Sequence, residues 1–268
     1  MVLSADNYYS QEANREYMSV SQYKAFAGTE GMSHCEFAAM EELEGRWEEE
    51  ATTPMLIGSY VDSYFEGTLR EFKAGHPQIF TQAGNLRAEY KKADEIIRRI
   101  ERDSLFMAAM SGEKQVIMTG ELFGAKWKIK MDSYTAGESI VDLKVVKAVH
   151  GKDAFTWVKD YGQTYFALVW GYDIQGAIYQ EIVRQNTGKK LPFYLAAATK
   201  QKEPDIELIE ITQNYLDYAL EQVRMNMPRV LRVKNKEAEP DRCGFCECCR
   251  RNKILTGPIP IPDIPEAF

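Results

Sequence analysis

One short segment, SIVDLKVVKAV at residues 139–149, constrains the fold more than any other part of the chain. Its run of Ile, Val and Leu residues predicts a β-strand that enters the core. Successive side chains of a strand point to opposite faces, so Asp142 and Lys144 share one face. Burying a charge without a partner is costly. The two side chains therefore form either a structural ion pair or part of a site that holds something charged.

The first third of the chain predicts helices. Capping-box patterns begin at Ser19 and Ser33, and Thr53 is a candidate N-cap that places Pro54 at the first helical position. Residues 85–103 carry an apolar stripe at helical spacing. These signals predict at least four helices before residue 110.

The middle of the chain changes to strand periodicity. Residues 113–147 alternate and are interrupted by three glycines, which predicts a three-stranded antiparallel meander. Asp132 lies at the end of the second strand, and Asp142 lies on the third. A short hairpin around Gly137 is therefore expected to bring the two carboxylates close together.

Helical periodicity then returns from Asp153 to Gln185 as two helices that divide near Gly171. Residues 190–200 and 205–211 predict two further strands, and Thr212 begins a long helix. The tail from Lys234 is rich in charge, Cys and Pro, and its GPIPIPDIPEAF segment is incompatible with a regular helix. This order of elements predicts one α/β domain with a mixed sheet.

Composition excludes few functions. The 268 residues carry a net charge of −7, which argues mildly against a protein that coats nucleic acid but not against an enzyme that acts on it. The first residues lack a signal-peptide pattern, and no apolar run reaches the roughly 18 residues of a membrane span. We therefore expect a cytoplasmic protein that does not contact a membrane.

Asp132 and Asp142 with an adjacent backbone carbonyl would form a hard oxygen site suited to Mg²⁺ or Mn²⁺. A neighbouring lysine, Lys144, could hold or deprotonate an attacking water and stabilise charge on a phosphate. This set suits metal-assisted hydrolysis of a phosphodiester. The alternative is a structural ion pair between Asp142 and Lys144, because such pairs are common and weak.

The flanking segments supply further candidates. Gln175 and Tyr179 are four residues apart and share one helical face, where they would contact a phosphate backbone or form a half-buried surface pair. Asp62 and Glu66 have the same spacing, and two such carboxylates repel one another unless a cation lies nearby. Glu113 is a further acidic candidate, with an exposed loop residue as the alternative.

Together these positions resemble a known family, the PD-(D/E)xK nucleases. Within it, the chain is most similar to the RecB/RecE-like exonucleases, including the phage-type exodeoxyribonuclease VIII group, over residues 19–249. The resemblance rests on the order of the motifs Gly58-x-x-x-Asp62, Glu113, Asp132, Asp142-x-Lys144 and Gln175-x-x-x-Tyr179.

The resemblance implies a restriction-endonuclease-like mixed β-sheet core flanked by helices, divalent metal ions, and hydrolysis of DNA from an end in recombination or phage DNA processing. It also implies one nuclease domain over residues 1–268, with a helical region to about 110, a catalytic core over about 111–232 and a Cys-rich tail from about 233. A single-strand annealing protein is an implied partner, and relatives often form homo-oligomeric rings around DNA.

Individual roles follow from the resemblance. Asp132 and Asp142, with the Leu143 carbonyl, would bind the metal, Lys144 would be the catalytic lysine, and Gln175 with Tyr179 would position DNA. Many relatives have His where this chain has Asp62, so Asp62 would bind a second metal or support the first. Glu113 matches an acidic position of some relatives.

Four of the five cysteines lie within residues 243–249, in the segment CGFCECC. This spacing in a chain without export signals favours a metal site over disulfides, with free thiols as the alternative. Cys243, Cys246 and Cys249 would supply three ligands, and Cys248 or the distant Cys35 the fourth. The arrangement resembles the iron–sulfur cluster of AddB-type nucleases, although thiolates at this spacing suit Zn²⁺ as well as [4Fe–4S].

One alternative function belongs to another class. The chain would be a non-catalytic module that binds nucleic acid or protein, stabilised by a Cys-coordinated metal or cluster. The complete set of Asp132, Asp142 and Lys144 favours the enzyme.

Overall fold

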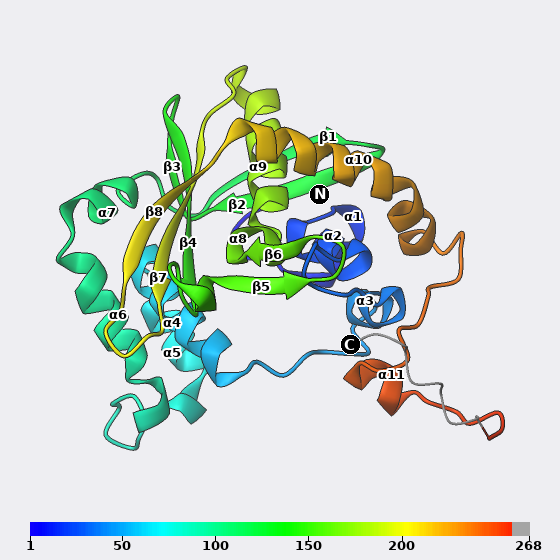
Figure 1. The fold of residues 1–268 in the computed structure, drawn as a ribbon, viewed down its shortest axis with the longest axis horizontal. Coiled ribbons are helices and arrows are strands. Elements are labelled where there is room, and N and C mark those ends of the chain that lie inside the picture. Colours follow the sequence, from blue (N-terminus) through cyan, green and yellow to red (C-terminus); the bar gives the residue numbers. More distant parts are fainter. Residues whose placement is uncertain (259–268) are drawn as a thin grey trace.

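The computed structural model describes residues 1–258. It has three layers, with a mixed four-stranded sheet between two layers of helices (Figure 1). The sheet has the order β3-β4-β7-β8, in which β4 runs parallel to β7 and the other neighbours are antiparallel. Its strands are β3 (Ser133–Thr135), β4 (Ser139–Val146), β7 (Phe193–Thr199) and β8 (Ile206–Ile211). This is the predicted α/β class with a mixed sheet flanked by helices.

Helices cover both faces of this sheet. On one face, helices α4 (Thr53–Glu66) and α6 (Lys92–Glu101) pack on Val141 and Leu143 of β4 and on Ala196 and Ala198 of β7. On the other face, α9 (Tyr172–Thr187) and α10 (Gln213–Lys234) pack on the alternate apolar residues of the same strands, whose side chains point the opposite way. Because β4 is covered on both sides, a polar side chain in its middle lies inside the protein.

The remaining helices are short and lie mostly near the two ends of the chain. They are α1 (Gln11–Glu16), α2 (Val20–Ala27), α3 (Glu36–Leu43), α5 (Leu69–Gly75), α7 (Ser104–Ala109), α8 (Phe166–Val169) and α11 (Glu247–Arg251). Figure 1 shows α11 beside α3, so the Cys-rich tail packs against the N-terminal region. No described helix is long and apolar enough to traverse a bilayer.

The predicted meander is two hairpins in two sheets. Strands β1 (Val116–Leu122) and β2 (Ala125–Met131) form a separate antiparallel pair, whereas β4 pairs with the short β3. The chain leaves the first sheet at Asp132, between β2 and β3. Gly124 and Gly137 form the two turns at φ +83° and +78°, a conformation that favours glycine, whereas Gly120 lies within β1.

The helix predicted from Asp153 is wrong in its first part. Residues 155–165 form the antiparallel hairpin of β5 (Phe155–Val158) and β6 (Gly162–Tyr165). Aromatic and β-branched residues favour a strand here, and the turn uses positive φ at Asp160 and Gly162. The predicted division at Gly171 is confirmed, because this residue is the left-handed N-cap of α9.

Helix starts were predicted with mixed success. The Ser19 side chain accepts from the Gln22 amide as expected, and Thr212 is the N-cap of α10. The second capping box is wrong: Cys35 caps α3, and the Glu36 carboxylate accepts from Arg229 and from the Asp241 amide instead of the Ser33 amide.

Two further helices begin elsewhere than predicted. The helix α4 includes Thr53 and is capped by Thr52, and the helix expected over 85–103 is shortened to α6. The proline-rich segment at the C-terminus lies largely outside the described residues, which end at 258.

Candidate active site

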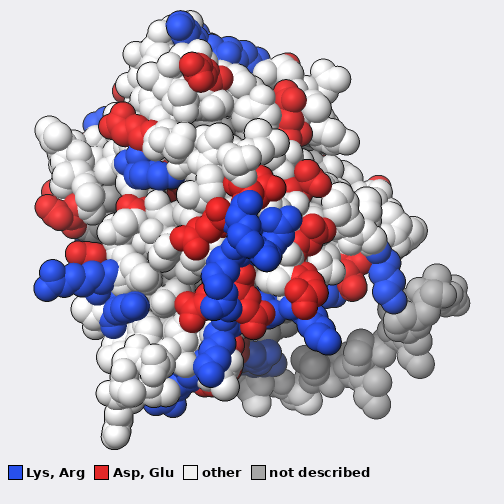
Figure 2. All heavy atoms as spheres, turned by 90° about the vertical axis from the view of Figure 1, so that its left-hand side faces the viewer, with Lys and Arg blue, Asp and Glu red and all other residues white. Residues whose placement is uncertain are grey.

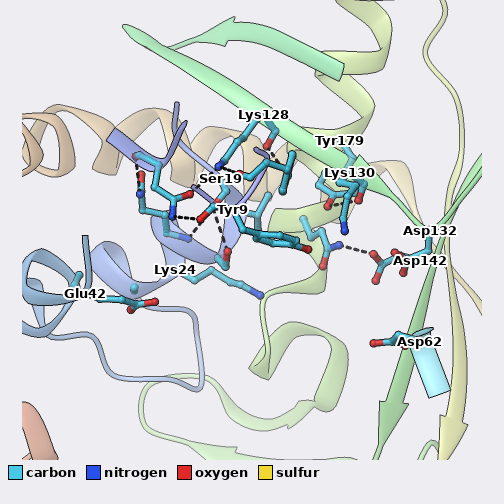
Figure 3. Close-up of a pocket in the computed structure, with 18 of the residues that line it drawn as sticks. Tyr9, Ser19, Lys24, Glu42, Asp62, Lys128, Lys130, Asp132, Asp142 and Tyr179 are labelled. Atoms are coloured by element: carbon cyan, nitrogen blue, oxygen red, sulfur yellow. Dashed lines mark hydrogen bonds between the residues drawn. The ribbon is translucent and has the colours of Figure 1, made fainter. Parts of the chain in front are cut away.

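A cavity of about 410 Å³ lies between β4, α4, α9, the end of β2 and the N-terminal helices. Figure 3 shows Asp62, Asp132 and Asp142 at one end of this cavity, with Lys24 and Tyr9 extending toward them from the other end. Asp132 and Asp142 come from one short stretch of the chain, whereas Asp62 comes from the distant helix α4. Their convergence gives the cavity an acidic end and a cationic, aromatic end.

Asp142 and Lys144 form an ion pair on the face of β4 that is turned toward α9. Only 3% of the Asp142 side chain is exposed, compared with 24% for Lys144. Gln175 in α9 donates from Nε2 to Asp142 Oδ1 over 2.6 Å. The charged pair is therefore held by a polar network that opens into the cavity. The sequence allowed either a structural ion pair or part of a site. The structure shows both features, because the two side chains pair with each other and also line the cavity.

Asp132 lies directly after β2, where the chain crosses toward the second sheet. The Leu143 amide donates to its Oδ2 over 2.9 Å, which fixes this carboxylate beside β4. Burial and the neighbouring Asp142 raise the pKa of Asp132 to about 7, although Lys144 and the Leu143 amide oppose the shift. The hairpin through Gly137 thus brings the two aspartates together as predicted.

Asp62 reaches the same place from the middle of α4. This helix packs on β4 and places Gly58 against Val145, so the next turn puts Asp62 beside the strand. Its buried Oδ1 has no hydrogen-bond partner among the described residues. Burial and then Asp132 raise the pKa of Asp62 well above its ordinary value.

An orphaned carboxylate oxygen beside two more carboxylates is a set of donors that a cation would satisfy. Asp62, Asp132 and Asp142 supply the oxygen ligands that Mg²⁺ and Mn²⁺ prefer. The Leu143 carbonyl lies beside them, where it accepts from Lys144 Nζ over 3.2 Å. The donor set therefore fits a divalent metal ion.

Lys144 is a cation among these carboxylates. Burial alone would lower its pKa, but Asp142 and Asp132 outweigh burial and raise it. Its ammonium also lies 5.5 Å from the ring centre of Tyr172. Lys144 is thus held as a charged donor at the acidic end of the cavity.

Gln175 and Tyr179 both line the cavity from one face of α9. The Tyr179 hydroxyl donates to the Lys130 carbonyl over 3.0 Å and so ties α9 to β2. Glu113, in contrast, is exposed, is bridged through its backbone to Tyr134 and does not line the cavity. The structure therefore brings together every predicted site residue except Glu113 and the cysteines.

The cavity also contains residues that the sequence did not assign to the site. Glu66 lies one helical turn after Asp62, a spacing that the sequence shows, and it lines the cavity too. Lys24 comes from α2, and burial together with Lys144 lowers its pKa to about 8. Lys130 lies over the ring of Tyr9 at 4.7 Å. Lys128 and Lys130 lie two residues apart on β2 and therefore share a face, but no sequence signal indicated that α2 and the N-terminal segment would pack over it.

Positive side chains elsewhere are mixed with negative ones. Figure 2 shows the face formed by α6 and α7, where Lys and Arg side chains lie among Asp and Glu. The four lysines that line the cavity, Lys24, Lys128, Lys130 and Lys144, instead lie around one concave surface. The same surface also carries five carboxylates, those of Glu42, Asp62, Glu66, Asp132 and Asp142, so the cavity combines both signs of charge.

A second cluster joins the two ends of the chain. The sulfur atoms of Cys35, Cys243, Cys246 and Cys249 all lie within 4.8 Å of one another. Cys35 and Cys249 are closest, with their Sγ atoms 3.5 Å apart. Cys248 is buried outside the cluster, so of the two candidates for a fourth ligand the structure selects Cys35.

Comparisons with known proteins agree with this fold. Residues 19–252 match the family described as a PDDEXK-like domain of unknown function. A crystal structure at 2.19 Å of a protein from Eubacterium rectale, described as a "putative exonuclease", is 65% identical and covers 97% of each chain with a TM-score of 0.93. No curated protein gives a significant match. These similarities support a nuclease, and the chain belongs to the PDDEXK-like domain family.

Proposed function

We propose that this nuclease is a metal-dependent exodeoxyribonuclease that hydrolyses phosphodiester bonds from DNA ends. The observation that carries the proposal is the convergence of Asp62, Asp132 and Asp142 with Lys144 in one cavity. A bound cation would also satisfy the Asp62 oxygen that has no hydrogen-bond partner among the described residues. The resemblance to RecE-like exonucleases and the described neighbour support action at an end.

Asp132, Asp142 and the Leu143 carbonyl would hold Mg²⁺ or Mn²⁺, with Asp62 as a further ligand. A bound ion would supply Lewis acidity and a more acidic bound water. Lys144 is charged beside the carboxylates, so it would donate to the attacking water or to the phosphate. Because the ammonium keeps its proton in this setting, a donor role fits it better than that of a base.

Gln175 and Tyr179 would act as positioning residues. Gln175 fixes the orientation of Asp142 through its 2.6 Å hydrogen bond. Tyr179 fixes the spacing between α9 and β2, the strand that carries Lys128 and Lys130 to the cavity. Lys130 and Lys24 would bind the phosphates of the incoming strand, whereas Lys128 is buried and donates to the Tyr8 carbonyl and to Asn14.

The test compares linear and circular duplex DNA with Mg²⁺, with Mn²⁺ and with EDTA. We expect linear DNA to be degraded only with a metal, and covalently closed circles to persist. Asp142→Asn should lower the rate by orders of magnitude because it removes a ligand charge. Asp153→Asn is the matched control, since Asp153 is exposed and pairs only with Lys147. Cleavage of closed circles would contradict action from ends, and full activity of Asp142→Asn would contradict the site.

The Cys cluster is proposed to hold one structural metal ion. Tetrahedral thiolates about 2.3 Å from zinc lie roughly 3.8 Å apart. The spacing of 3.5 Å between Cys35 and Cys249 agrees with this value. A [4Fe–4S] cluster, in which each sulfur binds a different iron, would hold the thiolates farther apart. We therefore propose Zn²⁺, and a visible iron–sulfur absorbance band in anaerobically purified protein would contradict it.

The cellular setting rests on the resemblance alone. We propose a cytoplasmic role in recombination or phage DNA processing, with a single-strand annealing protein as partner and a homo-oligomeric assembly. Sedimentation of the purified protein, alone and with a candidate annealing protein, tests both associations. A single monomeric species in each run would contradict them.

A further inference from the structure

A second cavity lies on the other side of α2 from the candidate active site. Its volume is about 200 Å³, and it is bounded by α2, the β5–β6 turn, the start of α9 and the middle of α10. One helix thus separates the two cavities: Lys24 lines the first, and Tyr23 and Ala27 line the second. A volume below the roughly 300–1,000 Å³ of drug-sized pockets suits a single ring system.

A buried carboxylate in this cavity has one oxygen without a partner. Asp173 is only 4% exposed, and its Oδ1 accepts no hydrogen bond within the described part of the chain. Leaving such an oxygen unsatisfied is unfavourable. Burial raises the pKa of Asp173 to about 7, so the group is an acceptor above neutral pH. The cavity therefore offers a buried acceptor to a ligand that donates a hydrogen bond.

Aromatic side chains form the rest of the opening. Tyr161, at the turn of the β5–β6 hairpin, is 54% exposed, and Tyr218 on α10 is 49% exposed. Exposed rings at the mouth of a small cavity favour a flat ligand that stacks on them.

The second cavity is connected physically to the active site. The helix α9 carries both Asp173, which lines the second cavity, and Gln175, which lines the first. Lys24 Nζ, from the first cavity, donates to the Trp170 carbonyl over 3.0 Å, just before α9 begins. Lys24 and Asp173 therefore both lie at the start of α9, so a DNA strand whose phosphates bind Lys24 would run close to the second cavity.

We propose that this cavity binds one unpaired base of a DNA strand, with Tyr161 stacking on the ring and Asp173 accepting from an exocyclic amino group. The inference rests on the proposed function and specifies its substrate as an end with unpaired bases. Cytosine carries an amino group where thymine carries a carbonyl oxygen. The site therefore favours cytosine over thymine.

The experiment measures binding of fluorescein-labelled dC₁₂ and dT₁₂ in EDTA at pH 8. The wild-type protein should bind dC₁₂ roughly tenfold more tightly, since a hydrogen bond to a charged group is lost with dT₁₂. Asp173→Asn should abolish this preference, because an amide donates to thymine as readily as it accepts from cytosine. Equal wild-type affinities, or a preference that survives in Asp173→Asn, would overturn the proposal.

Tyr161→Ala provides a second variant at an exposed turn, where unfolding is not expected. Loss of stacking should weaken binding of dC₁₂ roughly tenfold. Unchanged affinity would reject the stacking role. If the wild-type protein cleaves linear DNA but binds dC₁₂ and dT₁₂ equally, only this inference is refuted. A protein that shows the preference but cleaves no DNA with any metal refutes the proposed function alone.

Discussion

Gln175 in α9 donates a 2.6 Å hydrogen bond to Asp142 in β4, so a helix on one side of the sheet orients a charge in its central strand. The acceptor is Oδ1, while Oδ2 faces Lys144. A carboxylate held at both oxygens has one orientation toward a metal ion. This relationship explains how an apolar strand carries a charged pair without exposing it.

Gln175→Met is expected to lower kcat by roughly 10–100-fold, the usual effect of removing a partner of a metal ligand. The apolar side chain keeps the volume but frees Asp142 to rotate. Gln180→Met is the control, because Gln180 is equally buried in the same helix and bonds Leu191 and Gln213 away from the cavity. Equal activities of the two variants in a linear-duplex assay would refute the orienting role.

Lys144→Met should lower the rate by roughly 10²–10³-fold through loss of a preorganised cation. The change also leaves Asp142 buried without its ion pair. Lys147→Met, at a lysine whose side chain is 77% exposed, should retain full activity and stability. Single-turnover cleavage with saturating Mg²⁺ separates the chemical step from metal binding. A Lys144→Met rate within a few-fold of the wild type would show that the cation is dispensable.

Metal affinity should depend on pH through the aspartates. Burial and Asp142 raise the pKa of Asp132 to about 7, and only the deprotonated carboxylate binds a cation. Affinity for Mn²⁺ should therefore rise about tenfold per pH unit below 7 for each proton displaced, and level off above it. Calorimetric titrations at pH 6, 7 and 8 measure this slope. A constant affinity over that range would contradict displacement of a proton.

The sequence predicted the central elements well because each has a local cause. Alternation on β4 gave the shared face of Asp142 and Lys144, and the short turn at Gly137 gave the proximity of Asp132. Strand 155–158 was missed because only 4 residues of weak alternation compete with the helical periodicity that follows. Short hairpins are set by turn geometry, here the positive φ of Asp160, which the sequence indicates only weakly.

The sequence did not predict that the N-terminal region packs over the cavity. Lys24 and Tyr9 reach the cavity because the N-terminal region packs against β2, through pairs such as Met18 with Trp127. Such contacts depend on the whole core and not on any local pattern. The orphaned oxygen of Asp173 was invisible for the same reason, since burial of a side chain at a helix start follows from its neighbours.

Cys249→Ser should remove the bound metal and lower stability. Three thiolates remain, and the link between α11 and the N-terminal Cys35 is weakened. A metal present at about a hundredfold above its Kd contributes roughly 3 kcal/mol, which the variant would lose. Cys248→Ala is the matched control, because the adjacent Cys248 is outside the cluster. Metal content by mass spectrometry, followed by thermal melting, gives both readouts. Equal metal content in the two variants would exclude the cluster as the site.

Asp173→Asn should stabilise the free protein at high pH and not at low pH. The native pKa of Asp173 is about 7 and its ordinary value is 3.8, because burial disfavours the charged form. The folded state thus binds the proton more tightly than the unfolded chain, so its stability is highest below pH 4 and falls as pH rises toward 7. The difference corresponds to roughly 4 kcal/mol of destabilisation at pH 8. The neutral amide avoids this penalty.

Urea unfolding of both proteins at pH 4 and pH 8 measures the effect. The variant should be more stable by a few kcal/mol at pH 8 and nearly equal to the wild type at pH 4. A gain of the same size at both pH values would show that charge burial is not its cause. A destabilising carboxylate that opens into a cavity is typical of groups whose favourable partner is a ligand. Addition of dC₁₂ at pH 8 should therefore reduce the difference between the two proteins, because the ligand stabilises the wild type more.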